Sequence, residues 1–165
     1  MSGIVNSAGS RSGIIGVEVN PTQPAFLCVG DNGANYDLTD NYPYSTVNDI
    51  HGVWTVRYDQ GGDIDTTSGR VIFTAPLTGR YLFTFFCKFE NHTASDQIMH
   101  WLKTSNTEYW LEVDTDDLKR SSSFSVIADM DAGDTAQTRV INWTSARGNI
   151  IASTHWLSFS GCLIT

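Results

Sequence analysis

Residues 69–86, GRVIFTAPLTGRYLFTFF, constrain the possible folds of this chain more than any other stretch. Pro76 and Gly79 mark a turn, because Pro lacks an N–H and suits a strand end, while Gly tolerates backbone angles that other residues resist. On both sides of the turn, apolar side chains occupy every second position: Val71, Phe73, Tyr81, Phe83 and Phe85. This period of two is typical of half-buried strands. The stretch therefore predicts a β-hairpin against which the rest of the chain packs.

The remainder of the chain shows the same short alternating segments, separated by clusters of Gly, Asn, Asp and Pro about every ten residues. Few windows have helical periodicity. Further strands are predicted at residues 24–29, 53–58, 98–103, 108–113, 123–130, 135–143 and 155–164. We expect eight to ten strands in a single β-sandwich domain over residues 21–165, which is long enough to bury a core.

Residues 1–20 differ from this domain, because glycines break any helix and serines alternate with apolar groups. Such a segment orders on a surface more readily than alone. One interpretation is a frayed terminus. The other is an extended anchoring arm that places Ile4, Val5, Ile14 and Ile15 against a partner, with Arg11 pairing with a carboxylate there.

Charge and composition exclude several classes of function. The net charge of −8 argues against nucleic-acid binding, which needs clustered Lys and Arg. No apolar run approaches the roughly 20 residues of a membrane span. The N-terminus has no apolar signal-peptide core, so we expect synthesis in a cytoplasm. Cys28, Cys87 and Cys162 lie far apart in apolar segments, which favours small buried hydrophobic residues.

The residue types that perform catalysis or bind metals form no recognisable motif. None of the histidines, at positions 51, 92, 100 and 155, has a carboxylate or Cys at ligand or triad spacing, although such groups can still converge in space. The acidic cluster of Glu112, Asp114, Asp116 and Asp117 offers oxygen ligands for calcium, but it lacks the EF-hand pattern and a solvated surface is the commoner meaning. We predict no enzymatic activity, no metal and no cofactor.

Three ordered motifs carry a family resemblance. FTAPLTGRYLF (residues 73–83) resembles the signature F-x-A-P-x-x-G-x-Y-x-F of the complement-one-q globular head, which shares the tumour-necrosis-factor-like jelly roll. DAGDTA (131–136) resembles a turn of that family, and FSGCLI (159–164) resembles its closing strand. Met130, Ala136 and Cys162 depart from the usual residues. The resemblance covers residues 24–165 and implies an all-β jelly-roll sandwich.

The resemblance also implies the homotrimer that usually accompanies this fold. An aromatic-rich, wedge-shaped sandwich is able to bury one face against two further copies around a three-fold axis. The predicted interface residues are Tyr81, Phe83, Trp101, Tyr109, Trp110 and Phe159. For each of them, the core of the single chain is an equally good alternative.

The predicted function follows from the arm and the trimer together. The arm resembles the N-termini of structural proteins from tailed phages, and its 20 residues reach at most about 70 Å. The domain must therefore sit close to its anchor. This favours a capsid-decorating cement protein on the virion surface, which docks on the major capsid protein through three arms.

Two alternatives remain open. Within the virion, the chain would be the receptor- or glycan-binding knob of a tail fibre. Its ligand surface would be the aromatic- and Asn-rich loop 31–44 with the loops 91–96 and 145–149, and the candidate contacts are Tyr36, Tyr42, Tyr44 and His92. The alternative from another class is a secreted lectin-like binding module, which predicts that the isolated domain binds its ligand.

Overall fold

The computed structural model describes residues 23–38, 50, 52–92, 96–114, 119–142 and 148–164, with 112–114 and 119–120 given by their backbone alone. The proposed arm, Tyr42, Tyr44 and His51 lie outside the described residues. So do Asp116, Asp117 and the side chains of Glu112 and Asp114. Predictions that concern them therefore remain predictions.

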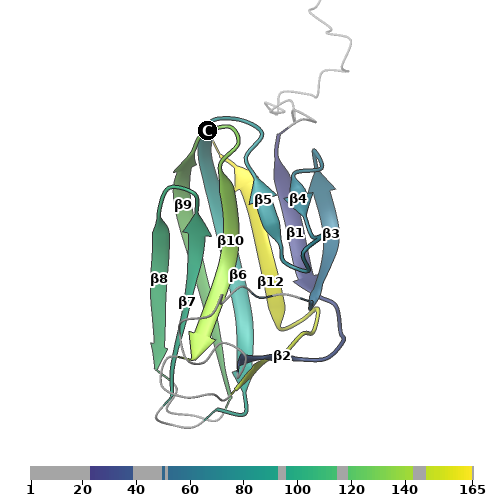
Figure 1. Ribbon diagram of the computed structural model, residues 1–165, viewed down its shortest axis with the longest axis vertical. Coiled ribbons are helices and arrows are strands. Elements are labelled where there is room, and N and C mark those ends of the chain that lie inside the picture. The colour runs from purple at the N-terminus through teal and green to yellow at the C-terminus, as the bar shows by residue number, and fades with distance from the viewer. Residues whose placement is uncertain are drawn as a thin grey trace, which may run out of the picture.

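The described chain folds into two antiparallel sheets whose strands run along the long axis of the molecule (Figure 1). Sheet A has the order β2 (Tyr36–Asp37), β11 (Asn149–Ile150), β6 (Gly79–Glu90), β12 (Leu157–Leu163), β1 (Ala25–Gly30) and β3 (Trp54–Gln60), with β9 (Lys119–Met130) pairing along the other side of β6. Sheet B has the order β4 (Ile64–Asp65), β5 (Ile72–Thr74), β10 (Thr135–Asn142), β7 (Gln97–Thr104) and β8 (Glu108–Asp114). The first and last long strands, β1 and β12, are neighbours.

The predicted hairpin at residues 69–86 is wrong in its pairing. Both strands exist, but β5 pairs with β4 and β10 in sheet B, while β6 pairs with β9, β11 and β12 in sheet A. Residues 75–78 therefore carry the chain from one sheet to the other. Alternation reports that one face of a strand is buried and does not report its partner. Phe73 and Tyr81 still meet, with ring centroids 5.3 Å apart, because the two sheets face each other.

The other predicted strands are confirmed with shifts of a few residues at their ends. The largest shift is in β9, which begins at Lys119, four residues before the predicted start. In the last strand, Ser153–Trp156 form a turn and β12 begins at Leu157. The sequence did not predict β2, β4 and β11. Each has two residues, which is too short to show a period.

Stacked and edge-on aromatic rings form the core between the sheets. Alternate residues of β6 are buried along its whole length, and Phe83 has ring centroids within about 6.5 Å of four neighbours. The fully buried aromatic side chains are Phe26, Phe73, Tyr81, Phe83, Phe85, Phe89 and Phe159. This arrangement corrects three predicted interface residues, because Tyr81, Phe83 and Phe159 have no exposed surface to offer to another copy.

Gly161 explains one feature of the closing motif FSGCLI. A Cβ added at this position would lie 2.7 Å from ring carbons of both Phe26 and Phe83. At this distance the atoms would clash, so the rings would have to move, and a densely packed core leaves no room for them to do so. The strand therefore crosses the aromatic core at a residue without a side chain.

The cysteines follow the prediction in part. Cys28 and Cys87 are buried, Cys162 is half-buried, and all three are free thiols. Burial raises the pKa of the Cys28 thiol to about 12, with a smaller contribution from the nearby Asp59. None of the described residues forms a helix with the length and apolar character needed to cross a membrane.

Candidate functional site

The outward face of sheet A carries apolar side chains in water-accessible positions. Strand pairing places Ile127, Leu82, Cys162 and Ala25 side by side across β9, β6, β12 and β1. Ile127 is 58% exposed, and Leu82 and Cys162 are half-buried. We call this line of residues the apolar row. It crosses most of the width of the sheet.

Two further rows continue the same face along the strands. The first contains Ser125, Thr84, Ser160 and Leu27, and the second contains Ser123, Phe86, Ser158 and Val29. None of these positions carries a charge, and the polar groups among them are hydroxyls. Thr84 and Ser125 already contact each other, with their hydroxyl oxygens 3.2 Å apart.

On β9, β6, β12 and β1, the charged groups of this face stand at its two ends in the described chain. At one end Arg80 Nε lies 3.1 Å from Asp129 Oδ1. At the other end the Lys88 ammonium lies 4.1 Å from the centre of the Trp156 ring, which also neighbours Phe86. The face of an antiparallel sheet that is exposed to water normally carries the polar residues of each strand, whereas the core of an interface between copies is depleted of charge. The outward face of sheet A has the second composition.

The outward face of sheet B has the opposite character. Lys103 and Glu108 face each other on β7 and β8, with Nζ 3.9 Å from Oε1, and Gln137 and Arg139 continue the surface on β10. Trp110 is the large apolar residue exposed on the described part of this face. Sheet B therefore presents a polar surface.

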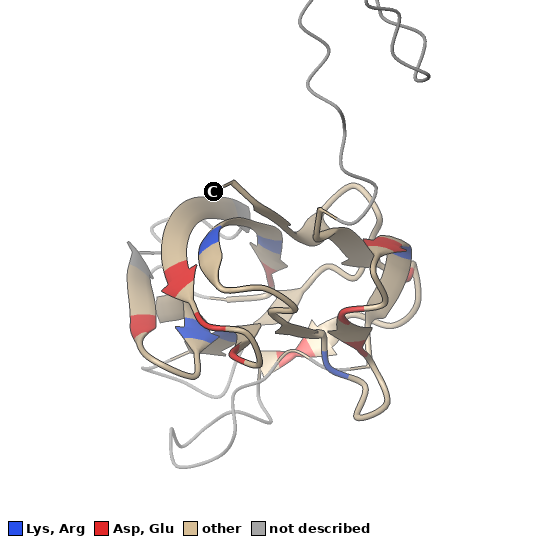
Figure 2. Ribbon diagram, turned by 90° about the horizontal axis from the view of Figure 1, so that it is seen from above, with Lys and Arg blue, Asp and Glu red and all other residues tan. Residues whose placement is uncertain are grey.

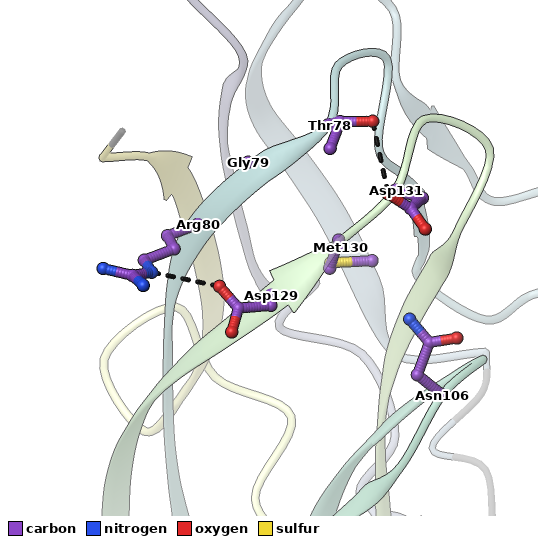
Figure 3. Close-up of a pocket in the computed structure, with 7 residues that line it drawn as sticks. All are labelled: Thr78, Gly79, Arg80, Asn106, Asp129, Met130 and Asp131. Atoms are coloured by element: carbon purple, nitrogen blue, oxygen red, sulfur yellow. Dashed lines mark hydrogen bonds and ion pairs between the residues drawn. The ribbon is translucent and has the colours of Figure 1, made fainter.

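A surface pocket of about 380 Å³ lies at the end of the sandwich where β6 begins and β9 ends (Figure 3). It is lined by Thr78, Gly79, Arg80, Asn106, Asp129, Met130 and Asp131. Seen from this end, acidic and basic residues are interspersed around the sandwich and do not form one patch (Figure 2). The pocket adjoins the apolar row, because Arg80 and Asp129 lie two residues from Leu82 and Ile127.

The polar groups near this pocket bind one another. Asp134 accepts hydrogen bonds from the Asp131 backbone N–H at 2.8 Å, from Ser105 Oγ at 2.9 Å and from Asn106 Nδ2 at 2.6 Å. These bonds lower the pKa of the Asp134 carboxyl, with the Asp131 backbone N–H as the largest cause. The network ties the β9–β10 turn to the β7–β8 turn, so the Asp134 carboxylate has a structural role.

A buried Cys, His and Ser meet between the sheets. His100 of β7 lies 3.0 Å from Ser122 Oγ through Nε2, and 3.9 Å from Cys87 Sγ through Nδ1. Phe85 and Phe124 pack edge-on against its ring. Burial lowers the pKa of His100 to about 4 and raises that of Cys87 well above its usual value. Both groups are therefore neutral near pH 7 and enclosed, and the contact joins the two sheets.

The structure corrects the predicted ligand loop. Tyr36 and His92 are buried, at 4% and 1% exposure, so their side chains do not form a ligand surface. Tyr36 belongs to β2 and packs into the core. The sequence does not predict this position, because β2 is a two-residue strand in a segment rich in Gly and Asn.

The predicted aromatic residues on sheet B divide between core and surface. Tyr109 points inward and packs against the core, while Trp101 is buried on the outward side beneath Trp110. Only Trp110 is well exposed.

Metal ligands do not cluster in the described part of the chain. No group of three or more His, Cys, Asp or Glu side chains there is placed to bind a metal ion. Several aspartates instead stabilise turns: Asp59 accepts hydrogen bonds from the backbone N–H groups of residues 63 and 64, and Asp65 accepts them from Thr67.

The candidate interface residues that the sequence analysis missed are Leu82, Phe86, Ile127 and Trp156. Ile127 had a visible signal, because it stands on the serine side of its strand, opposite Phe124, Val126 and Ala128. The others lie on the half-exposed side of β6 or in a turn, and only the observed pairing brings them onto one face.

Solved structures with this arrangement belong to the complement-one-q and tumour-necrosis-factor jelly rolls. The globular domain of zebrafish complement 1qA is 17% identical, with a TM-score of 0.58 over 86% of this chain and 98% of that one. Eiger TNF from S. frugiperda is 14% identical, with a TM-score of 0.62 over 87% and 94%. Murine APRIL is 12% identical, with a TM-score of 0.58 over 86% and 99%.

These similarities establish the fold. The chain is an all-β, two-sheet jelly roll of this type, as the sequence motifs predicted. Proteins with this fold are typically non-enzymatic binding modules and typically form trimers. No family model matches the sequence, and no curated protein matches it.

Proposed function

We propose that the chain is the subunit of a homotrimer in which the outward face of sheet A packs against two further copies. The uncharged face built on the apolar row carries this proposal. Full burial of a Leu, Ile or Phe side chain contributes roughly 1.5–3 kcal/mol, and each subunit would bury Leu82, Phe86 and Ile127. Sheet B, with its ion pair, remains in solvent.

We further propose that the trimer is a non-enzymatic structural protein that decorates a viral capsid and docks through residues 1–20. The described chain enters the sandwich beside its own C-terminal strand, where Leu163 N–H bonds to Pro24 O at 3.0 Å. In a trimer built on sheet A, three arms would leave from the same end. Three anchors on one particle raise the strength of docking without new chemistry. The opposite end, which carries β2 and β11, would point away from the shell (Figure 1).

The proposed interface predicts that Ile127→Asp separates the copies. A carboxylate at this exposed position is harmless in a single chain, but it would be buried unpaired between subunits, which costs several kcal/mol. In light scattering we expect the full-length protein at three times the 18.2 kDa chain mass and Ile127→Asp at the mass of one chain.

Leu77→Asp provides the matched control, because Leu77 is also an exposed apolar residue but lies in the turn before β6. It should remain trimeric. A monomeric full-length protein, or a trimer that tolerates Ile127→Asp, would contradict the proposed interface.

The capsid role predicts a separate effect of residues 1–20. A chain that begins at residue 21 retains every described strand, so it should stay trimeric but no longer bind capsid shells that lack the decoration protein. Co-sedimentation with such shells measures this. Docking that does not need the arm, or full-length trimers that bind host cells and ignore shells, would refute the decoration role and favour a receptor-binding knob.

A further inference from the structure

We propose that the outward face of sheet B around Trp110 is a binding site for a neutral sugar ring. A row of three side chains crosses this face: strand pairing places Trp110 directly opposite Trp101, and Trp101 directly opposite Arg139. The two indoles are stacked, with centroids 4.2 Å apart and planes inclined by 12°.

The stack holds Trp110 in a fixed orientation. Trp101 is only 3% exposed and supports one face of the Trp110 ring, while Trp110 itself is 49% exposed. An aromatic side chain that is already held in place loses little conformational entropy when a ligand covers it. Such a flat, pre-positioned ring suits the apolar C–H face of a pyranose.

An orphan polar atom suggests that structural stability alone does not explain this row. Trp101 Nε1 is buried and has no hydrogen-bond partner among the described residues. Buried donors of this kind cost stability and are rare in native proteins. The indole that supports Trp110 thus buries a polar atom that no hydrogen bond compensates in the described chain.

The groups beside Trp110 match the hydroxyl rim of a sugar. The adjacent row contains Glu108, Lys103 and Gln137, which together supply an acceptor, a donor and an amide that does both. Lys103 and Glu108 are paired and partly exposed, so they remain accessible to hydroxyl groups. A small-ligand site usually combines an apolar contact surface with a small number of polar groups around it.

The same features favour a sugar over a protein partner. A stable protein interface covers about 800 Å² on each side and has an apolar centre. Here one exposed ring stands among polar and charged groups, which fits a ligand the size of one ring. The net charge of −8 disfavours acidic sugars, so the ligand class is neutral hexose or N-acetylhexosamine.

This site adds a ligand class to the proposed function. It rests on the proposed trimer only for the number of sites in one particle. Because sheet B is the layer opposite the proposed interface, a trimer would display three sites at once. A flat site of this kind binds weakly, and three together bind a surface of repeated sugars with higher avidity.

The test uses the full-length protein on an array of neutral and sialylated oligosaccharides, followed by titration of the best neutral one in solution. We expect neutral glycans to bind, and Trp110→Ala to weaken the solution affinity by about tenfold or more through loss of the aromatic contact. Leu77→Ala, which removes an exposed apolar side chain elsewhere, should bind like the unaltered protein.

Light scattering of Trp110→Ala separates the two proposals, because this variant should stay trimeric. Ile127→Asp should bind the glycan in solution with unchanged affinity per site, but it should lose the higher avidity that three sites give on the array. The sugar site can therefore be tested even if the protein does not form a trimer. Failure of all neutral glycans to bind, or equal binding by Trp110→Ala, would overturn the site. Binding to cell-surface proteins that survives deglycosylation and needs Trp110 would overturn it in favour of a protein ligand.

Discussion

Replacement of Phe83 by alanine is expected to lower the free energy of unfolding by about 3–5 kcal/mol. Phe83 is fully buried, and its ring lies 5.7–6.4 Å from the rings of Phe26, Phe73, Phe159 and Tyr81. The substitution loses the free energy gained by transferring the ring from water to the core. It also leaves a cavity lined by aromatic rings from both sheets. Because these partners come from four different strands, no single side chain is able to fill the space.

Urea unfolding at one fixed protein concentration measures this effect, since the stability of an oligomer depends on concentration. Leu77→Ala serves as the control and should change the free energy of unfolding by less than about 0.5 kcal/mol, as surface substitutions usually do. A loss of less than about 1 kcal/mol for Phe83→Ala would show that the ring is not enclosed as described.

Acidification from pH 6.5 to pH 4 is expected to remove about 3 kcal/mol of stability through His100 alone. Burial lowers the pKa of this side chain from 6.5 to about 4. Between these two values the unfolded chain binds a proton that the folded chain does not bind, so falling pH favours unfolding. Above pH 6.5 the imidazole is neutral in both states and contributes no pH dependence.

The comparison with His100→Leu isolates this group. The unaltered protein should lose about 1.4 kcal/mol per pH unit more than the variant across this window. Leu77→Ala is the control, because it replaces an exposed side chain that does not titrate and should leave the slope unchanged. Equal slopes for the unaltered protein and His100→Leu would show that His100 is accessible to solvent or already charged in the fold.

The sequence predicted the strands because local alternation shows which side of each strand is buried, and it predicted the jelly roll through the resemblance of three motifs to a known family. Alternation along β6 identifies Tyr81, Phe83 and Phe85 as the buried side, and the turn motifs place the strand ends. It did not predict that β5 and β6 join different sheets. That choice depends on which distant strand, β10 or β9, pairs with each, and local periodicity contains no information about the partner.

The candidate surfaces were harder to predict, because aromatic content does not distinguish a core from an interface. Phe159 and Trp110 are both apolar strand residues, yet one is in the core and the other is half exposed. Leu82 and Cys162 become neighbours only through the pairing of β6 with β12. Ile127 was detectable, since it interrupts the polar side of a serine-rich strand.

The accessibility of the Cys162 thiol tests the proposed trimer face most directly. Cys162 lies beside Leu82 in the apolar row, while Cys28 and Cys87 are buried within each chain. Titration of the native full-length protein with a thiol reagent should therefore detect no rapidly reacting group. In the Ile127→Asp variant it should detect one per chain. One rapidly reacting thiol per chain in the native protein would show that the outward face of sheet A stays open to solvent.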